Sequence, residues 1–166
     1  MEDKYCYAVF NPRATKLPAS GISKFKNPAI CWSRNFADGE CKRMKSPTGN
    51  WAESVRLEKV WNNRSIEVVR VSLDKLYSLI VPLASKISKD SIYVIYDPRK
   101  KSMPVLYAYL PLFNTKKLAD KNYEQLKDLN SCPKKYRAEK KKEFRNVVIG
   151  RIMRTDFYEL IKSSSK

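Results

Sequence analysis

The sequence predicts an α+β fold, with a mostly antiparallel sheet organised on a central hairpin at about residues 91–111, helices packed on one side of it, and a long basic C-terminal helix. Two short runs of β-branched and aromatic residues, 92–96 and 105–110, flank a segment with two prolines and three consecutive cations, which is typical of a hairpin. Apolar side chains recur at three- and four-residue spacing in the segments that we assign to helices. We expect the arms of the hairpin to be buried and its tip to be solvated.

Further strands are expected where short apolar runs end at turn-forming residues, at 5–10, 29–33, 51–61 and 66–71. The last two would pair through a turn at 62–64. Prolines and glycines interrupt the remainder of 13–47, which we expect to be irregular.

Three helices are predicted from the apolar spacing, at 73–87, 116–129 and 134–161. Ser72 can cap the first, which Pro82 should kink or end, and Asn114 or Thr115 can cap the second. The third carries most of the C-terminal positive charge. Within it, Gly150 should weaken the helix by about 1 kcal/mol relative to alanine.

The charge balance is the most informative property of the composition. The 166 residues include 34 Lys and Arg, 17 Asp and Glu and no His, for a net charge of +17, and 43% of them are hydrophobic. This composition predicts one folded domain at 1–162 with a disordered tail at 163–166. Such a charge repels itself unless an anionic partner neutralises it, so we expect nucleic acid first and an anionic membrane second. The alternative is a chain that is basic for solubility alone.

Targeting signals and metal motifs are not evident. The first residues are acidic and precede no apolar segment, and no run is long enough to span a membrane. We therefore expect a protein that is not secreted and is cytoplasmic or located with its nucleic acid. Of the two anionic candidates we keep nucleic acid and expect no membrane partner. The four cysteines form no Cys-x-x-Cys pair, which indicates free thiols and no structural zinc. No cofactor and no metal are predicted.

Two clusters of cations are the candidate nucleic-acid contacts. Residues 134–154 contain nine cations and two carboxylates, a net charge of +7, and in a helix Arg137, Lys141 and Arg145 would share one face. A solvated helix surface is the alternative explanation. The candidate contacts are Lys134, Lys135, Arg137, Lys140, Lys141, Lys142, Arg145, Arg151 and Arg154, with Arg99, Lys100 and Lys101 at the hairpin tip.

Aromatic residues lie among the cations of the first third of the chain. Phe25, Trp32 and Phe36 could stack on bases, in which case the partner would be single-stranded or have a flipped base. Packing in the core is the alternative.

The hairpin resembles the motif of the GIY-YIG nucleases over about twenty residues. Residues 91–93, Ser-Ile-Tyr, are similar to its first half and 105–109, Val-Leu-Tyr-Ala-Tyr, to its second, with Lys116 and Lys117 beginning the next helix. Both motif glycines are missing, and no arginine stands where that family requires one in the following helix. The resemblance implies a nuclease-like hairpin without the family's catalytic set.

Our leading hypothesis is a non-catalytic protein that binds duplex DNA through phosphates with little sequence specificity. The first alternative is a small viral or phage accessory factor in transcription regulation, which would bind a host protein such as RNA polymerase on DNA. The second is a metal-dependent nuclease; without His it would need Asp and Glu as ligands, and Glu40-Cys41-Lys42 has the form Glu-x-Lys. The absence of His excludes imidazole catalysis, and the four glycines include no phosphate-loop spacing.

Overall fold

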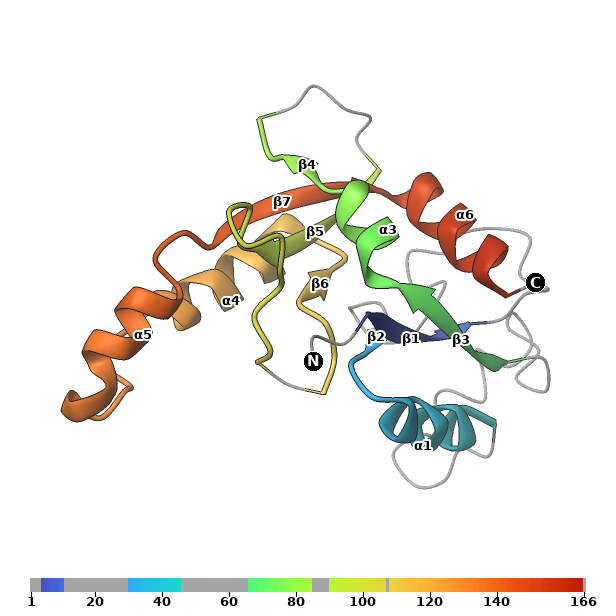
Figure 1. Ribbon diagram of the computed structural model, residues 1–166, viewed down its shortest axis with the longest axis horizontal. Helices are drawn as coiled ribbons and strands as arrows, with labels where there is room; N and C mark the ends of the chain where they lie inside the picture. The colour runs from blue at the N-terminus through green and yellow to red at the C-terminus, as the bar shows by residue number, and fades with distance from the viewer. Residues whose placement is uncertain (1–3, 11–29, 46–65, 85–89, 107, 166) are drawn as a thin grey trace.

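The computed structural model describes residues 4–10, 30–45, 66–84, 90–106 and 108–165, and confirms the α+β class (Figure 1). Its strands form two antiparallel sheets, of order β2-β1-β3 and β4-β7-β5-β6. The strands are β1 (Tyr5–Phe10), β2 (Ile30–Cys31), β3 (Glu67–Ser72), β4 (Val81–Pro82), β5 (Ser91–Tyr96), β6 (Leu112–Phe113) and β7 (Val148–Met153). The helices are α1 (Arg34–Lys45), α3 (Leu73–Ser78), α4 (Lys116–Lys127), α5 (Arg137–Glu143) and α6 (Arg154–Ser164), with a 3₁₀ turn, η3 (Lys134–Tyr136).

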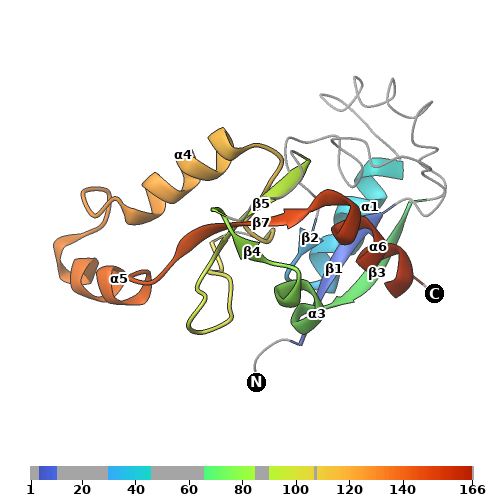
Figure 2. The same ribbon diagram turned by 90° about the horizontal axis from the view of Figure 1, so that it is seen from above.

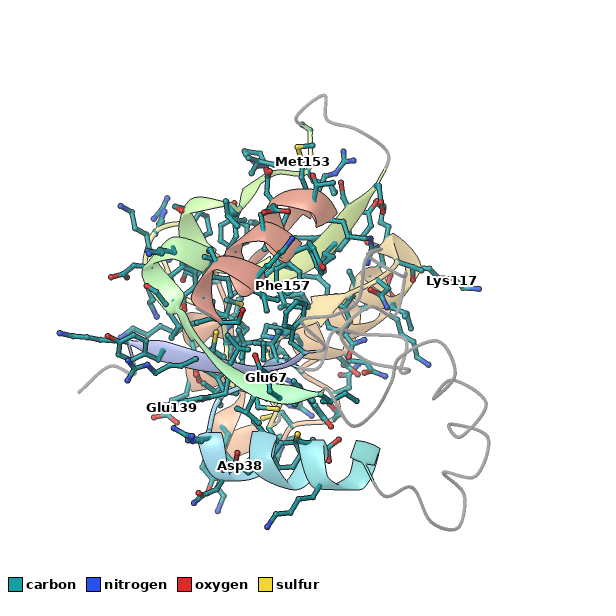
Figure 3. The ribbon with its side chains drawn as sticks, turned by 90° about the vertical axis from the view of Figure 1, so that its right-hand side faces the viewer. Asp38, Glu67, Lys117, Glu139, Met153 and Phe157 are labelled. Atoms are coloured by element: carbon teal, nitrogen blue, oxygen red, sulfur yellow. The ribbon has the colours of Figure 1, made fainter. Side chains whose placement is uncertain are left out.

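The three-stranded sheet lies between helices. β1 pairs with β3 from Tyr5↔Ser72 to Phe10↔Glu67, and β2 pairs with the other edge of β1. α1 covers one side and α6 the other, whereas we predicted all helices on one side (Figures 1 and 3). The Phe10 ring meets Tyr158 of α6 edge-on at 5.6 Å between centroids. The main hydrophobic core therefore continues from the sheet into α6.

β5, one of the two central strands of the four-stranded sheet, is buried on both faces. Ile92 and Val94 belong to the core shared with the first sheet, and Ile95 belongs to a second core with Ala119 and Leu126 of α4. A strand enclosed in this way needs a nearly continuous apolar sequence, which Ser-Ile-Tyr-Val-Ile-Tyr supplies. α4 thus packs on the sheet face that points away from the first sheet.

The predicted hairpin is only half correct. β5 and the turn after it form as expected, closed by a bridge between Asp97 and Ser102, but its neighbours in the sheet are β6 and β7. The described residues 103–106 and 108–110 form no strand, and Val105 is 72% exposed. The second arm instead reaches the other sheet, where the Leu110 amide donates to the Ile30 carbonyl (2.8 Å). The likeness to the GIY-YIG hairpin therefore ends at the turn.

The prediction of one helix over 134–161 is wrong. This segment contains η3, α5, strand β7 and the first part of α6. A four-residue repeat such as Phe144, Val148 and Ile152 is also a multiple of the two-residue period of a strand, so the spacing fits both structures. The β-branched residues of 147–152 favour the strand, and the six-pair ladder with β5 stabilises it.

Other boundaries follow local signals. Ser72 caps α3 by accepting the Lys75 amide, and Thr115 caps α4 by accepting the Leu118 amide, as predicted. α3 nevertheless ends at Ser78, before the kink or end that we expected at Pro82 and well before 87, and Pro82 lies in the edge strand β4. α1 occupies a segment that we expected to be irregular. The strand expected at 51–61 and the turn at 62–64 lie outside the described residues.

The C-terminal helix ends later than predicted, and the cysteines are unpaired as predicted. α6 continues through Ser164, so it includes two residues of the tail predicted at 163–166. All four cysteines are free thiols, as predicted; Cys132 is half-buried and the other three are buried. None of the described helices has the length and apolar character needed to cross a bilayer.

Candidate nucleic-acid interface

Residues 116–145 form a helical arm that projects from the two sheets (Figures 1 and 2). We call it the basic arm, because it holds eleven cations and five carboxylates, a net charge of +6. α4 attaches it to the sheet through its buried Ala119 and Leu126. α5, by contrast, buries none of its side chains. The distal half of the arm is therefore a solvated, charged structure.

Two lysines join the helices of the basic arm, because each lysine donates from one helix to carbonyls at the C-terminal end of the other. The Lys127 ammonium, at the end of α4, donates to the carbonyls of Phe144 and Arg145, which follow α5. The Lys140 ammonium of α5 donates to the carbonyl of Asp128, the C-cap of α4, at 2.7 Å. Cations stabilise these unpaired carbonyls at the negative ends of the helix dipoles. Lys140, one of the predicted contacts, thus also has a structural role.

The remaining predicted cations of the arm are distributed differently from a single helical face. Arg145 lies beyond the end of α5, so it does not continue the row of Arg137 and Lys141. Arg137 is half-buried, and its Nε donates to the Cys132 carbonyl at 3.1 Å. The exposed cations between η3 and the end of the arm are Lys134, Lys135, Lys141, Lys142 and Arg145.

The turn after β5 presents three more cations. The Asp97 carboxylate accepts the amides of Arg99 (2.9 Å) and Lys100 (3.2 Å), and Lys101 has a positive φ of 48°. All three cationic side chains are exposed, as predicted for the tip. Tyr96 pairs with Val148, so this turn and the end of the basic arm leave the four-stranded sheet at the same end. The two predicted cation clusters therefore both follow from the same end of this sheet.

Two predicted contacts are used inside the protein. Arg154 is buried and donates to Asp90 (2.7 Å), to the Asn114 side chain (3.1 Å) and to the Ser91 carbonyl (3.3 Å). The Arg151 guanidinium donates to the Ser91 hydroxyl at 3.2 Å. These arginines join the end of β7 to the start of β5. The structure does not bring them to the surface of the basic arm.

The predicted stacking aromatics pack against the main core. The Phe36 ring meets Tyr109 edge-on, with centroids 5.1 Å apart and an interplanar angle of 88°. Trp32 is half-buried against the same core, and its backbone amide donates to the Ala108 carbonyl. Phe25 lies outside the described residues. A role in base stacking stays a prediction.

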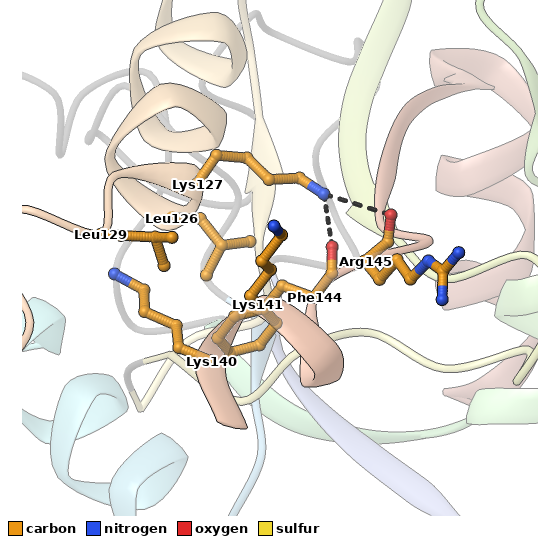
Figure 4. Close-up of a pocket in the computed structure, with 7 residues that line it drawn as sticks. All are labelled: Leu126, Lys127, Leu129, Lys140, Lys141, Phe144 and Arg145. Atoms are coloured by element: carbon orange, nitrogen blue, oxygen red, sulfur yellow. Dashed lines mark hydrogen bonds between the residues drawn. The ribbon is translucent and has the colours of Figure 1, made fainter. Parts of the chain in front are cut away.

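The basic arm also contains a pocket of about 290 Å³ that we did not predict from the sequence (Figure 4). Its lining consists only of apolar and cationic residues: Leu126, Lys127, Leu129, Lys140, Lys141, Phe144 and Arg145. The signal available in the sequence was that apolar and basic residues lie close together in both 126–129 and 140–145. The pocket itself needs the antiparallel return of the chain, which no local pattern specifies.

The thiol chemistry of the core is suppressed rather than activated. Burial raises the pKa of Cys6 to about 12, and burial together with the nearby Glu40 carboxylate raises the pKa of Cys31 to about 12. Glu40 is itself buried on α1, where it accepts the Tyr109 hydroxyl at 2.6 Å. The Glu-x-Lys sequence at 40–42 thus places its carboxylate inside the protein.

Known proteins give no further direction. Within the part of the chain that the structure describes, no three His, Cys, Asp or Glu side chains lie close enough together to hold a metal ion. No family model, no curated protein and no solved structure matches this chain. The function must therefore be argued from the surface itself.

Proposed function

We propose that this protein binds duplex DNA through its phosphates, with little sequence specificity and without catalysis. The observation that supports the proposal is the excess of cations at the distal end of the basic arm, where residues 134–145 contain seven cations and two carboxylates, a net charge of +5. In the described residues, the arm's one ion pair of a cation with a carboxylate, Lys116 with Asp120, lies at the start of α4. The distal cations are thus available to a polyanion.

The arrangement suits a regular phosphate backbone. α5 and the turn carrying Arg99, Lys100 and Lys101 provide two sets of exposed cations at one end of the four-stranded sheet. Lysine dominates both sets, and its ammonium acts as a point charge on phosphates rather than as a planar reader of base edges. This composition favours affinity without sequence recognition.

A salt series tests the proposal directly. Binding of a short duplex DNA would be measured by fluorescence anisotropy at 50–300 mM NaCl, with the same sequence as single-stranded DNA and as duplex RNA. We expect the duplex DNA to bind tightest, with a log–log slope of roughly −4 to −8, because each neutralised phosphate contributes about −0.9. Weak binding to all three polymers, insensitive to salt, would reject the proposal.

Two double variants of equal charge separate the surface from the total charge. Lys134→Gln with Lys142→Gln removes two exposed cations from the basic arm, and Lys75→Gln with Lys162→Gln removes two from α3 and α6. Both lower the net charge from +17 to +15. We expect the first pair to reduce the salt slope by about 2 and the second to leave it nearly unchanged. Equal effects would show that only the overall charge matters.

The accessory-factor hypothesis predicts a different result. If the protein recruits a host protein such as RNA polymerase, that partner should remain bound in a pull-down after the lysate has been treated with nuclease. Loss of every partner on nuclease treatment favours nucleic acid as the direct ligand. Duplex DNA that stays intact after incubation with the protein and Mg²⁺ would exclude the nuclease alternative under those conditions.

A further inference from the structure

We propose that the pocket of the basic arm takes a single unstacked nucleotide of the bound DNA, such as an unpaired base at the end of the duplex. This inference rests on the proposed function, and it assigns a separate role to a separate set of residues. Figure 4 shows these residues converging from the end of α4 and from α5 and the turn after it.

The floor of the pocket is apolar and includes an aromatic ring. Leu126 is buried, while Leu129 and Phe144 are half-buried and line the cavity. A base exposes an apolar face once it leaves the stack, and stacking on aromatic side chains compensates for the lost neighbour. The apolar floor therefore provides the stacking surface that an unstacked base lacks in water.

The rim of the pocket is entirely cationic. Lys127 and Lys140 are held by backbone carbonyls, which leave their charges unneutralised and part of their donor capacity unused, because an ammonium has three N–H groups. Lys141 and Arg145 are exposed and form no ion pair with any described residue. Four cations around an apolar floor, with no carboxylate in the lining, select an anion that also carries an apolar ring. A nucleotide has both parts.

The size of the pocket supports a small occupant. A volume of about 290 Å³ lies just below the range of about 300–1,000 Å³ that small-ligand sites occupy. One nucleotide suits this volume better than a longer single strand, which would extend onto the exposed cations of α5. The inference is therefore limited to one nucleotide, with the adjacent phosphates held by Lys141 and Arg145.

The test compares three duplexes of one sequence: blunt, with one unpaired 3′ nucleotide, and with an abasic residue in place of that nucleotide. We expect the unpaired nucleotide to increase affinity about 5- to 20-fold over the blunt and abasic duplexes, which corresponds to about 1–1.8 kcal/mol of base stacking. A 2-aminopurine at the unpaired position reports whether its base moves from the duplex end into the protein, through a change in its fluorescence.

Variants identify the pocket as the site. Phe144→Leu keeps the floor apolar but removes the ring, and should abolish most of the preference; Tyr136→Leu, at an exposed aromatic outside the pocket, should not. Lys141→Gln should reduce the preference, whereas Lys142→Gln, the next residue of the same helix, should weaken binding to all three duplexes equally. Circular dichroism confirms that each variant is folded.

The outcomes separate the two proposals. Equal affinity for the three duplexes would overturn the inference and leave the proposed function intact. A preference that persists in Phe144→Leu and Lys141→Gln would place the unpaired nucleotide elsewhere and also overturn it. Failure of all three duplexes to bind would reject the proposed function, and with it the inference that depends on it.

Discussion

Gly150 occupies a position in β7 where a larger residue has no room. A Cβ at this position would lie 2.5 Å from Tyr96 Cε1, 2.9 Å from Ile80 Cγ2 and 3.1 Å from the Val81 carbonyl oxygen. The apolar spacing of the sequence predicted a helix at this glycine, where alanine would have been the more stable residue. In the strand, alanine is expected to be less stable than glycine, because the ring of Tyr96 and the neighbouring strand β4 occupy the space that a Cβ would need.

Gly150→Ala should therefore destabilise the protein, and Gly39→Ala should stabilise it. We expect a loss of about 1–3 kcal/mol from overpacking at position 150. Gly39 lies within α1 with no atom within 4 Å of a Cβ built there, so alanine should add about 0.5–1 kcal/mol through helix propensity. Urea unfolding followed by circular dichroism measures both. A stable Gly150→Ala variant would contradict the close packing of β7 on Tyr96.

The buried thiols predict a loss of stability at high pH. The pKa values of Cys6 and Cys31 rise from 9.0 to about 12 on folding, so above pH 9 the unfolded chain loses protons that the folded chain keeps. Their contribution is complete below pH 9 and disappears as the pH rises from 9 to 12. At pH 10.5 we expect each thiol to lower the free energy of unfolding by on the order of 1–2 kcal/mol relative to pH 8.

Urea unfolding at pH 8 and pH 10.5 measures this effect. The Cys6→Ala and Cys31→Ala variants should each show a smaller decrease than the unchanged protein, although both lose some packing at every pH. Cys132→Ala is the control, because Cys132 is half-buried and its thiol lies outside both cores. An identical decrease in all four proteins would show that other groups cause it.

At the scale of elements, the two helices of the basic arm depend on each other through lysine caps. Lys127→Met and Lys140→Met each remove a charged donor to C-terminal carbonyls while keeping an unbranched, helix-compatible side chain. We expect each variant to lower the local opening free energy of α5 by about 0.5–2 kcal/mol. Amide hydrogen exchange should then become faster in α5 and stay unchanged in β5 and β7.

Lys121→Met provides the matched control on α4, because Lys121 is exposed and carries the same charge. Faster exchange of α5 in this control as well would attribute the effect to net charge. Unchanged exchange in all three variants would show that the caps contribute little beyond what water provides.

Local sequence patterns predicted some boundaries of these elements correctly and others incorrectly. β1 begins and ends at the predicted residues, β3 is shifted by one residue, and Ser72 and Thr115 cap the helices as expected. Each of these features depends on neighbours in the sequence. The strand predicted for the second arm of the hairpin does not form, because β6 and β7 pair with the two edges of β5. β7 lies over fifty residues later in the chain, so no local pattern specifies this pairing.

In the candidate site too, the sequence indicates which residue types are present, but only the structure shows where each side chain lies. Composition was sufficient to select Lys141 and Lys142 of α5 and the three cations of the turn after β5 as exposed side chains. It could not separate Arg154, whose guanidinium is buried against Asp90 and Asn114, from the surface cations. Nor could it show that Lys127, absent from the predicted contacts, lines a pocket with Phe144. Both facts depend on contacts between distant segments.

At the scale of the whole molecule, the net charge of +17 should make stability depend on salt. Raising NaCl from 20 to 300 mM shortens the screening length to well under about 10 Å and weakens repulsion among the exposed cations. We expect Tm to rise by roughly 2–8 °C, equivalent to about 1–2 kcal/mol at about 2–4 °C per kcal/mol. Differential scanning calorimetry without nucleic acid measures this.

A variant with Lys75→Glu and Lys162→Glu lowers the net charge from +17 to +13 and should show a smaller increase of Tm with salt. The same increase in both proteins would indicate a general salt effect on hydration rather than relief of charge repulsion. A flat response in the original protein would mean that its cations are already far enough apart to be screened.

The sequence by itself determined the α+β class, the basic character, the free thiols and those boundaries that a cap or a turn specifies, because these depend on composition or on residues a few positions apart. Tertiary structure decided which of two compatible periods residues 148–153 adopt, which arginines are buried, and where the pocket lies. The physical reason is that a repeat of four residues suits both a helix face and a strand face, and that only pairing with β5 and packing on Tyr96 make the strand the more stable choice.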